Sequence, residues 1–303
     1  MNRRRLLREA AALAAFTLSG WRAFAEESVM TRRFYMPSPW GQLHIHEARP
    51  GDGSRGTKPA LICFHQTSGS GKLYVPFLPY LATDRVVMAV DTPGYGASDG
   101  PADEASIEDY ASAIATALDS LGYGNGKNGP LDVLGLLTGS MIAGELTLSR
   151  PDLVRRLVLA QSPMLNADER TMMHDTMVEM LDANWREKGA GYYQDRLSRT
   201  LGALGPDDSS ELAMEAYVET VLPGRAFMKG ELAAMRYSAI DLFTGIERPT
   251  LILSLGPNLK DKVMRGVDVV PKAILIEEPD LDRRMFRRDP AKLAPIFRDY
   301  LDS

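Results

Sequence analysis

Short apolar runs alternate with amphipathic stretches along most of the chain. Six runs have the length and composition of buried strands, at residues 60–64, 85–90, 131–134, 154–160, 250–255 and 273–277. Two further segments, 33–36 and 42–48, are separated by a Pro- and Gly-containing turn and predict an N-terminal hairpin. Helical spacing of apolar residues predicts helices over 73–81, 107–121, 140–149 and 291–301. Strands that alternate with helices indicate an α/β fold, in which a parallel sheet is covered on both faces.

The pattern changes between residues 163 and 246. This block contains no buried apolar run and instead predicts helices over 170–188, 192–204, 210–221 and 225–243. We therefore expect a helical cap at 163–246, inserted into a core that comprises residues 26–162 and 247–303.

One stretch combines a strand, a tight turn and a helix. The apolar run 131–134 precedes Gly135 and Gly139, and a helix with Ile142 and Leu146 follows. This Gly-x-x-x-Gly pattern is typical of a nucleophile elbow, whose middle residue protrudes at the end of a parallel sheet. Here that middle residue is Leu137.

Several motifs share the order and spacing of one superfamily. His65-Gln66 follows the third strand, Asp-Thr-Pro-Gly-Tyr-Gly-Ala-Ser-Asp follows the fourth at 91–99, the elbow comes next, and Arg-Pro-Asp-Leu-Val begins at Arg150. Together they resemble the capped α/β-hydrolase superfamily over essentially the whole chain after residue 25. The resemblance implies an eight-stranded, mostly parallel sheet, an oxyanion loop at 65–69 and an inserted helical cap.

The resemblance also locates the three positions of a catalytic triad. The nucleophile position is Leu137, and the acid position after the seventh strand is Leu259, beside Asn258. The base would follow the eighth strand, but no histidine occurs after His174. Acyl transfer needs a nucleophile, a base and a group that orients the base. The sequence therefore predicts a member of the superfamily that lacks the Ser-His-Asp triad.

Other residues could carry a rearranged chemistry, and His65 and Ser140 are the catalytic candidates. His65 is expected at the pocket floor, and an imidazole ordinarily titrates near neutral pH, although this position of the family is usually structural. Ser140, Thr138 and Ser162 are more simply explained by local hydrogen bonds. If these groups are active, the protein is a lyase, an isomerase, a cofactor-free oxygenase or an unusual ester hydrolase.

The predicted ligand is a small apolar or aromatic molecule in a pocket beneath the cap. Methionines of the cap offer a pliable lining, although they are also ordinary core residues. The residues expected to line the pocket are His65, Gln66, Thr67, Leu137, Thr138, Met164, His174 and Leu259. No cofactor is expected, and the oligomeric state stays open.

The first 25 residues have the order of parts of a secretory signal. Arginines at positions 3–5 and 8 precede an apolar segment at 10–20 and the small-x-small sequence Ala-Phe-Ala, which ends at Ala25. The paired arginines followed by Leu-Leu resemble the twin-arginine type. We predict cleavage after Ala25 and a periplasmic or secreted protein, with an uncleaved anchor as the alternative. The apolar segment is too short for a membrane span.

Charge and the rarer residues narrow the range of partners. Cleavage after Ala25 removes five arginines and one glutamate, which changes the formal net charge from −5 to −9. Such an acidic chain is not expected to bind nucleic acid or an anionic membrane. Cys63, the only cysteine, lies in an apolar run and is expected in the core. His44 and His46 share one strand face, but without a supporting cluster in the sequence we predict no metal site.

Overall fold

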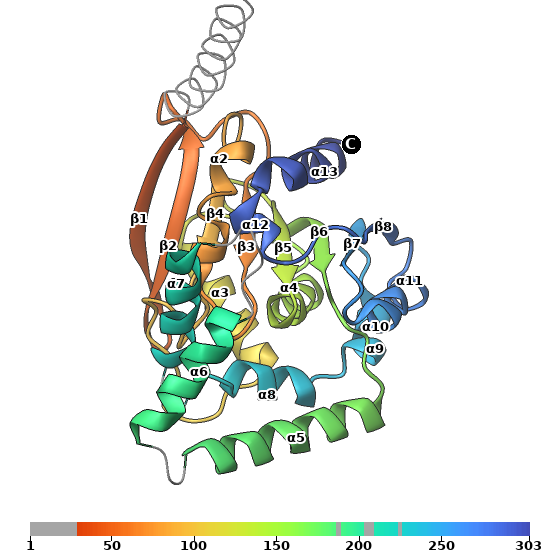
Figure 1. Ribbon diagram of the computed structural model, residues 1–303. Helices are drawn as coiled ribbons and strands as arrows, with labels where there is room; N and C mark the ends of the chain where they lie inside the picture. Colours follow the sequence, from red (N-terminus) through yellow and green to blue (C-terminus); the bar gives the residue numbers. More distant parts are fainter. Residues whose placement is uncertain (1–28, 186–188, 203–208, 224–225) are drawn as a thin grey trace, which may run out of the picture.

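The computed structural model describes residues 29–185, 189–202, 209–223 and 226–303, and the predicted signal lies outside them. Eight strands form one sheet in the order β1-β2-β4-β3-β5-β6-β7-β8 (Figure 1). The strands are β1 (Val29–Ser38), β2 (Gly41–Pro50), β3 (Leu61–Phe64), β4 (Val87–Val90), β5 (Leu131–Leu136), β6 (Val154–Ala160), β7 (Thr250–Leu255) and β8 (Ile274–Glu278). β2 pairs antiparallel with β1 and β4, and every other pair is parallel. The predicted eight-stranded, mostly parallel sheet is confirmed.

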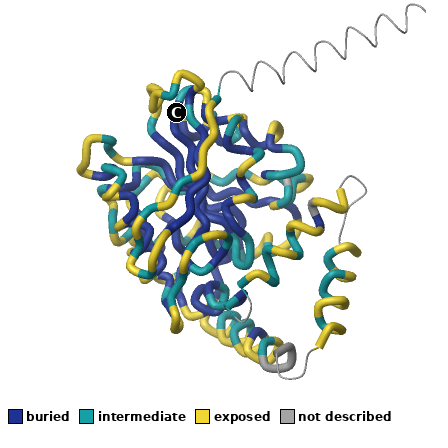
Figure 2. The backbone as a smooth tube through the Cα atoms, turned by 90° about the vertical axis from the view of Figure 1, so that its left-hand side faces the viewer, coloured by how far each residue is buried: buried dark blue, intermediate teal, exposed yellow. Residues whose placement is uncertain are grey.

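Helices cover both faces of the sheet, and the strands bury residues toward both. Along β3, Ile62 and Phe64 join one apolar cluster with α3 (Ile107–Ser120) and α4 (Thr138–Ser149). Leu61 and Cys63 join the opposite cluster, with α2 (Leu78–Leu81), α12 (Met285–Arg288) and α13 (Pro290–Asp302). Successive side chains of a strand point to opposite faces, so a strand buried on both sides is apolar at every position. The buried centre of the sheet is visible in Figure 2.

Among the described residues between β6 and β7, the regular elements are all helical. These are α5 (Ala167–Trp185), α6 (Ala190–Gly202), α7 (Ser210–Val221), α8 (Lys229–Arg236), α9 (Ala239–Leu242) and the 3₁₀ turn η3 (Phe243–Gly245). In Figure 1, α5 and α8 run beneath one end of the sheet, and α6 and α7 lie together beside it. This block corresponds to the predicted cap, whose boundaries of 163–246 stay a prediction.

Two predicted helices are each divided in two. The stretch 73–81 forms the 3₁₀ turn η1 (Gly71–Tyr74) and α2, because Pro76 and Pro79 lack the N–H groups of a continuous helix. The stretch 225–243 is divided between α8 and α9, where Tyr237 adopts an extended ψ of 125°. α10 (Lys260–Met264), α11 (Gly266–Val269) and α12 were not predicted, since helices of four or five residues carry little periodicity.

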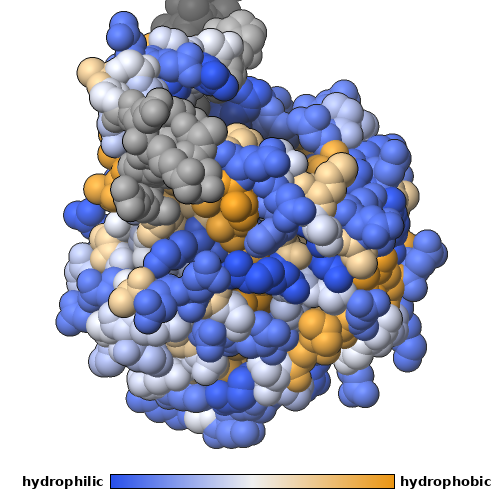
Figure 3. Space-filling model, turned by 90° about the horizontal axis from the view of Figure 1, so that it is seen from below, coloured by the Kyte–Doolittle hydropathy of each residue, from blue (hydrophilic) through white to orange (hydrophobic). Residues whose placement is uncertain are grey.

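Seen from the side of α5, the surface is mostly hydrophilic with separate apolar patches (Figure 3). Met172 and Met180 of α5 are among the exposed large apolar side chains. Among the described residues, no helix has both the length and the apolar character that a membrane span requires.

Candidate functional site

The chain turns sharply between β5 and α4. Leu136 ends β5, Thr138 begins α4, and Leu137 between them has φ 51° and ψ −115°. Residues with a side chain rarely adopt this combination. A Cβ on Gly135 would lie 2.2 Å from the carbonyl oxygen of Gly139, so the close approach requires glycine. The segment has the geometry of a nucleophile elbow, and the residue that it presents is a leucine.

The acid position after β7 holds a second leucine with positive φ. Leu259, with φ 61°, precedes α10. Beside it, the carbonyl oxygen of Asn258 accepts a hydrogen bond from Gln161 Nε2 at 2.8 Å. Gln161 Oε1 accepts another from the Leu255 N–H at 2.7 Å. Gln161 thus ties the ends of β6 and β7 together, a role that the sequence did not indicate because the two segments are distant along the chain.

The base position after β8 contains no histidine. Asp282 and Arg284 follow the strand there and form an ion pair of 2.8 Å. The four histidines of the chain all lie in other elements: His44 and His46 in β2, His65 after β3, and His174 in α5.

His65, a catalytic candidate, is buried and already hydrogen-bonded through both ring nitrogens. Its Nδ1 lies 2.8 Å from the Gln66 carbonyl oxygen. Its Nε2 accepts from the Thr92 N–H at 2.9 Å. Burial lowers the pKa of His65, so the ring is neutral at neutral pH. These bonds place His65 where it holds the loop after β3 against the loop after β4.

Ser140, the other catalytic candidate, is fully buried in the first turn of α4. Its Oγ lies 2.5 Å from the Leu137 carbonyl oxygen and 2.8 Å from Ser162 Oγ. A hydroxyl enclosed in this way satisfies local polar groups at the start of the helix. The structure therefore agrees with the simpler interpretation of Ser140 and Ser162.

A cavity of about 820 Å³ is bounded by the elbow and by the helices after β6. Its apolar lining includes Leu73, Leu137, Leu255, Leu259 and Met180. The rest of the lining is mainly polar and includes five arginines: Arg196, Arg199, Arg283, Arg284 and Arg287. The sequence led us to expect an apolar pocket. It missed the arginines because they come from α6 and from the segment after β8, which looked like solvated surface.

The structure brings only some of the predicted pocket residues together. Gln66, Leu137 and Leu259 line the cavity. The other five predicted residues, His65, Thr67, Thr138, Met164 and His174, are not among its described lining residues. Met164 is fully buried in the core, and His174 lies on α5 with Nδ1 3.3 Å from Asp175 Oδ1. Met164 and His174 differ from the expectation because neither the path of the segment after β6 nor the position of α5 can be read from the local sequence.

Arg196 differs from most of the other arginines of the cavity in its partners. Its guanidinium donates to Tyr192 Oη at 2.8 Å and to Thr220 Oγ1 at 3.2 Å, and lies 4.6 Å from the centre of the Phe227 ring. All three partners are uncharged. Among the described residues, Arg196 has no carboxylate partner, whereas Arg199 pairs with Asp195 at 2.8 Å.

Glu219 brings a carboxyl group from α7 into the same cavity. Its Oε1 accepts a hydrogen bond from Ser70 Oγ at 2.6 Å, which joins the cap to the loop after β3. Burial raises the pKa of Glu219, an effect that the bond from Ser70 and the charge of Lys72 only partly offset. The sequence did not indicate this residue, because glutamates on amphipathic helices usually face solvent.

A second polar group lies beneath the loop after β4. His44, His46 and Asp91 are at least nine-tenths buried, and one ligand atom from each lies within 4.8 Å of the others. The sequence showed only the two histidines, which share one face of β2. Asp91 joins them because β2 pairs directly with β4. Among the described residues, this is the group of side chains that could hold a metal ion.

Comparisons with known proteins agree with this fold. A family profile described as the alpha/beta hydrolase fold matches residues 59–219, more than half of the chain. The chain therefore belongs to the α/β-hydrolase fold family.

Similar proteins include hydrolases from several bacteria. The (E)-2-((N-methylformamido)methylene)succinate hydrolase of Acinetobacter baylyi is 24% identical over 207 residues, which cover 66% of this chain and 73% of that protein. A hydrolase from Pseudomonas aeruginosa PA01 superposes with a TM-score of 0.70 and 18% identity, over 90% of this chain and 99% of that one. A thermophilic esterase from Thermogutta terrifontis with malate bound superposes with a TM-score of 0.68 and 16% identity, over 89% of this chain and 98% of that one. The two structural similarities establish the fold alone.

Proposed function

We propose that this protein is a binding protein for a small organic anion and does not catalyse acyl transfer. The observation that carries the proposal is Leu137 at the elbow, because a leucine side chain can neither attack a carbonyl carbon nor transfer a proton. Leu259 cannot orient a base, and the segment after β8 contains no histidine to act as one. In this proposal the cavity binds a ligand but lacks the triad groups that hydrolyse an ester.

The lining suggests the chemistry of the ligand. Four leucines and Met180 offer an apolar surface, and Arg196 offers a guanidinium that uncharged neighbours hold in place. Arginine binds a carboxylate through two parallel hydrogen bonds. We therefore narrow the predicted apolar ligand to a carboxylic acid with an apolar body. Two of the similar proteins are described with dicarboxylates, one as a hydrolase of a succinate derivative and one with malate bound.

Titration calorimetry with paired ligands tests this proposal. Phenylacetate, hexanoate, succinate and malate are each compared with their neutral amides at one ionic strength. We expect at least one acid to bind about tenfold more tightly than its amide, since a charge-assisted pair contributes about 1.5–3 kcal/mol. Arg196→Ala should remove that preference, and Arg199→Ala, one turn along α6, should keep it. Equal affinity for acids and amides would refute the proposed ligand class.

A fluorophosphonate probe tests the claim about catalysis separately. Intact-mass spectrometry should show no adduct on the wild-type protein. Leu137→Ser should also turn over no p-nitrophenyl ester, because the cavity has no histidine among its described lining residues. Stoichiometric labelling of a serine in the wild-type protein would refute this part of the proposal.

Glu219 gives one specific reason to keep the alternative of a rearranged enzyme. A buried carboxyl group whose pKa is raised above its ordinary value can act as a general acid or base. In that case Glu219, rather than His65 or Ser140, would be the acid–base group of a lyase or isomerase. Turnover of any acid in the panel that is lost in Glu219→Gln would establish this alternative.

Export through the twin-arginine route and cleavage after Ala25 stay proposals that rest on residues 2–25. Fractionation of a producing cell tests both. The mature protein should occur in the periplasm or medium, and replacement of Arg3, Arg4 and Arg5 by lysine should retain it inside the cell.

A further inference from the structure

We propose that His44, His46 and Asp91 form a binding site for one divalent transition-metal ion, with Zn²⁺ as the best match. The site is separate from the cavity above Leu137. It lies where β2 meets the end of β4, and it would bind β2 to the loop that follows β4.

The positions of the donor atoms match a small metal ion. Asp91 Oδ2 lies 2.9 Å from His44 Nδ1, and Asp91 Oδ1 lies 3.7 Å from His46 Nε2. Ligands at about 2.0–2.1 Å from a tetrahedral zinc ion lie roughly 3.3 Å from one another. The two separations from Asp91 bracket this value, and all three donor atoms lie within 4.8 Å of one another, so side-chain movements would bring them to the distances of a zinc site. Two imidazoles and one carboxylate are a donor set that suits zinc, copper, iron and nickel and not magnesium or calcium.

The observation that points to a bound ion is an unpaired ring nitrogen of His46. Its side chain is more than nine-tenths buried, and its Nε2 has no hydrogen-bond partner. Buried ring nitrogens are normally paired. The ring centres of His44 and His46 lie 4.6 Å apart, so the two imidazoles are direct neighbours. A metal ion bonded to His46 Nε2 would satisfy this atom.

Backbone hydrogen bonds hold the Asp91 carboxylate in a fixed orientation. Its Oδ1 accepts from the Gly71 N–H at 2.7 Å, and its Oδ2 accepts from the Ala97 N–H at 2.8 Å. Such bonds fix the orientation of a carboxylate before metal binds. An ion at this site would take the place of the hydrogen bond between His44 Nδ1 and Asp91 Oδ2.

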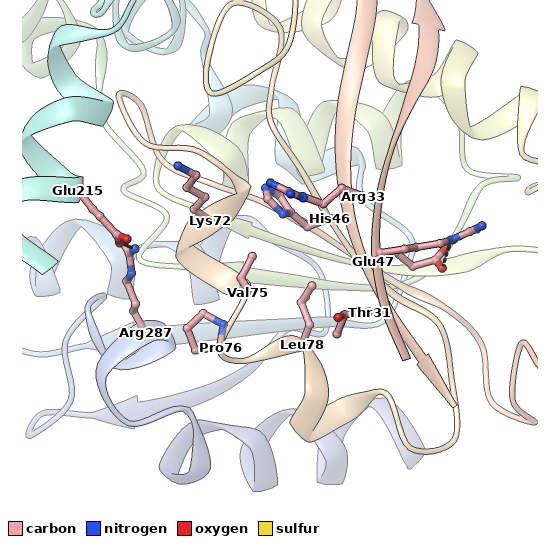
Figure 4. A pocket seen from close by; sticks show the side chains of 11 residues that line it. Thr31, Arg33, His46, Glu47, Lys72, Val75, Pro76, Leu78, Glu215 and Arg287 are labelled. Carbon is pink, nitrogen blue, oxygen red and sulfur yellow. Dashed lines mark hydrogen bonds and ion pairs between the residues drawn. The ribbon is translucent and has the colours of Figure 1, made fainter. Parts of the chain in front are cut away.

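A cavity of about 430 Å³ gives access to the site. His46 reaches it from β2, and Arg33 and Lys72 lie on either side (Figure 4). Water in this cavity would supply the fourth ligand. The charges of Arg33 and Lys72 oppose a cation, but both side chains are exposed and can turn toward solvent. The other two cations that line the cavity are paired, Arg32 with Glu47 and Arg287 with Glu215.

The positive charge of Lys72 allows metal binding at this site to be distinguished from anion binding in the same cavity. Removing a nearby positive charge strengthens the binding of a metal ion and weakens that of phosphate. Lys72→Ala should therefore bind Zn²⁺ at least as tightly as the wild-type protein. If phosphate binds and Lys72→Ala loses it while Zn²⁺ does not bind, the cavity is an anion site and the proposal is wrong.

The experiment uses the untagged mature protein, treated with EDTA and then dialysed. Zn²⁺ is titrated by calorimetry, and Co²⁺ is followed by its visible d–d absorption, which reports the geometry of the ligands. We expect one ion per chain, a tetrahedral Co²⁺ spectrum and an increase in Tm with Zn²⁺. His46→Gln should lose all three, and His174→Ala, which removes a partly exposed histidine on α5, should keep them.

A second variant guards against misfolding. Asp91→Asn removes a metal ligand but retains an oxygen for the amides of the loop, and circular dichroism and the Tm without metal check that it folds. The folded variant should also lose the Co²⁺ spectrum. The absence of stoichiometric binding, or binding that survives both His46→Gln and Asp91→Asn, would overturn the proposal.

Discussion

Leu137 has the backbone conformation of a nucleophile elbow but no nucleophilic side chain. The strain of this conformation can be measured through the free energy of unfolding. Its φ of 51° and ψ of −115° lie outside the regions that suit a residue with a Cβ. Holding a residue there costs about 1–3 kcal/mol. We predict that Leu137→Gly is more stable than Leu137→Ala by about 1 kcal/mol, because glycine relieves the strain but has a larger unfolded-state entropy of about 0.5–1 kcal/mol.

The comparison of Ala with Gly isolates the backbone. Both variants lose the side chain of Leu137, which is partly buried against the core, so its loss cancels. Urea unfolding followed by circular dichroism gives the free energy of unfolding for each, and equal m-values confirm that the unfolded states are comparable.

Ser112, exposed within α3, is the matched control. There the order should reverse, with Ser112→Gly about 1 kcal/mol less stable than Ser112→Ala, as at ordinary helical positions. If Leu137→Gly is also less stable than Leu137→Ala by that amount, the elbow is not strained and the reasoning fails.

Three further predictions concern packing, pH and ligand charge. Gly139→Ala should destabilise the protein by about 3 kcal/mol or more in urea unfolding. The new Cβ would lie 2.2 Å from the Phe64 carbonyl oxygen, a backbone atom that cannot turn away. An unchanged unfolding midpoint would contradict this. Burial raises the pKa of Asp132 from 3.8 to about 6, so the free energy of unfolding should fall by up to about 3 kcal/mol between pH 3.8 and pH 6. Asp132→Asn should flatten that part of the stability profile, and a parallel profile would refute the assignment. Affinity for the anionic ligand should fall as rising pH ionises Glu219, by roughly fivefold or about 1 kcal/mol, and calorimetry of Glu219→Gln should show no such fall.

Much of the fold could be predicted because it depends on local pattern. The buried run at 61–64 is apolar at every position, and the run at 131–136 is apolar except at Asp132, a pattern typical of strands covered on both faces. Gly135 and Gly139 marked the elbow because no other residue fits so close an approach of two backbones. Where prolines or short segments interrupted the pattern, as at 73–81 and 260–264, the prediction failed.

The candidate site could be predicted only in part. Gln66, Leu137 and Leu259 were found because they lie in the turns that follow strands ending at one edge of the sheet. Arg196 and Glu219 were not, because their helices have polar faces whose direction depends on how the cap packs.

The sequence by itself determined the layered α/β architecture and the leucine at the elbow, since alternation, glycine spacing and residue identity are written along the chain. Only the tertiary structure decided that Glu219 meets Ser70, 149 positions earlier, and that Asp91 joins His44 and His46. The physical reason is that hydrogen bonds and metal ligation depend on distances of a few ångströms. Between segments far apart in the sequence, those distances are set by packing and not by local propensity.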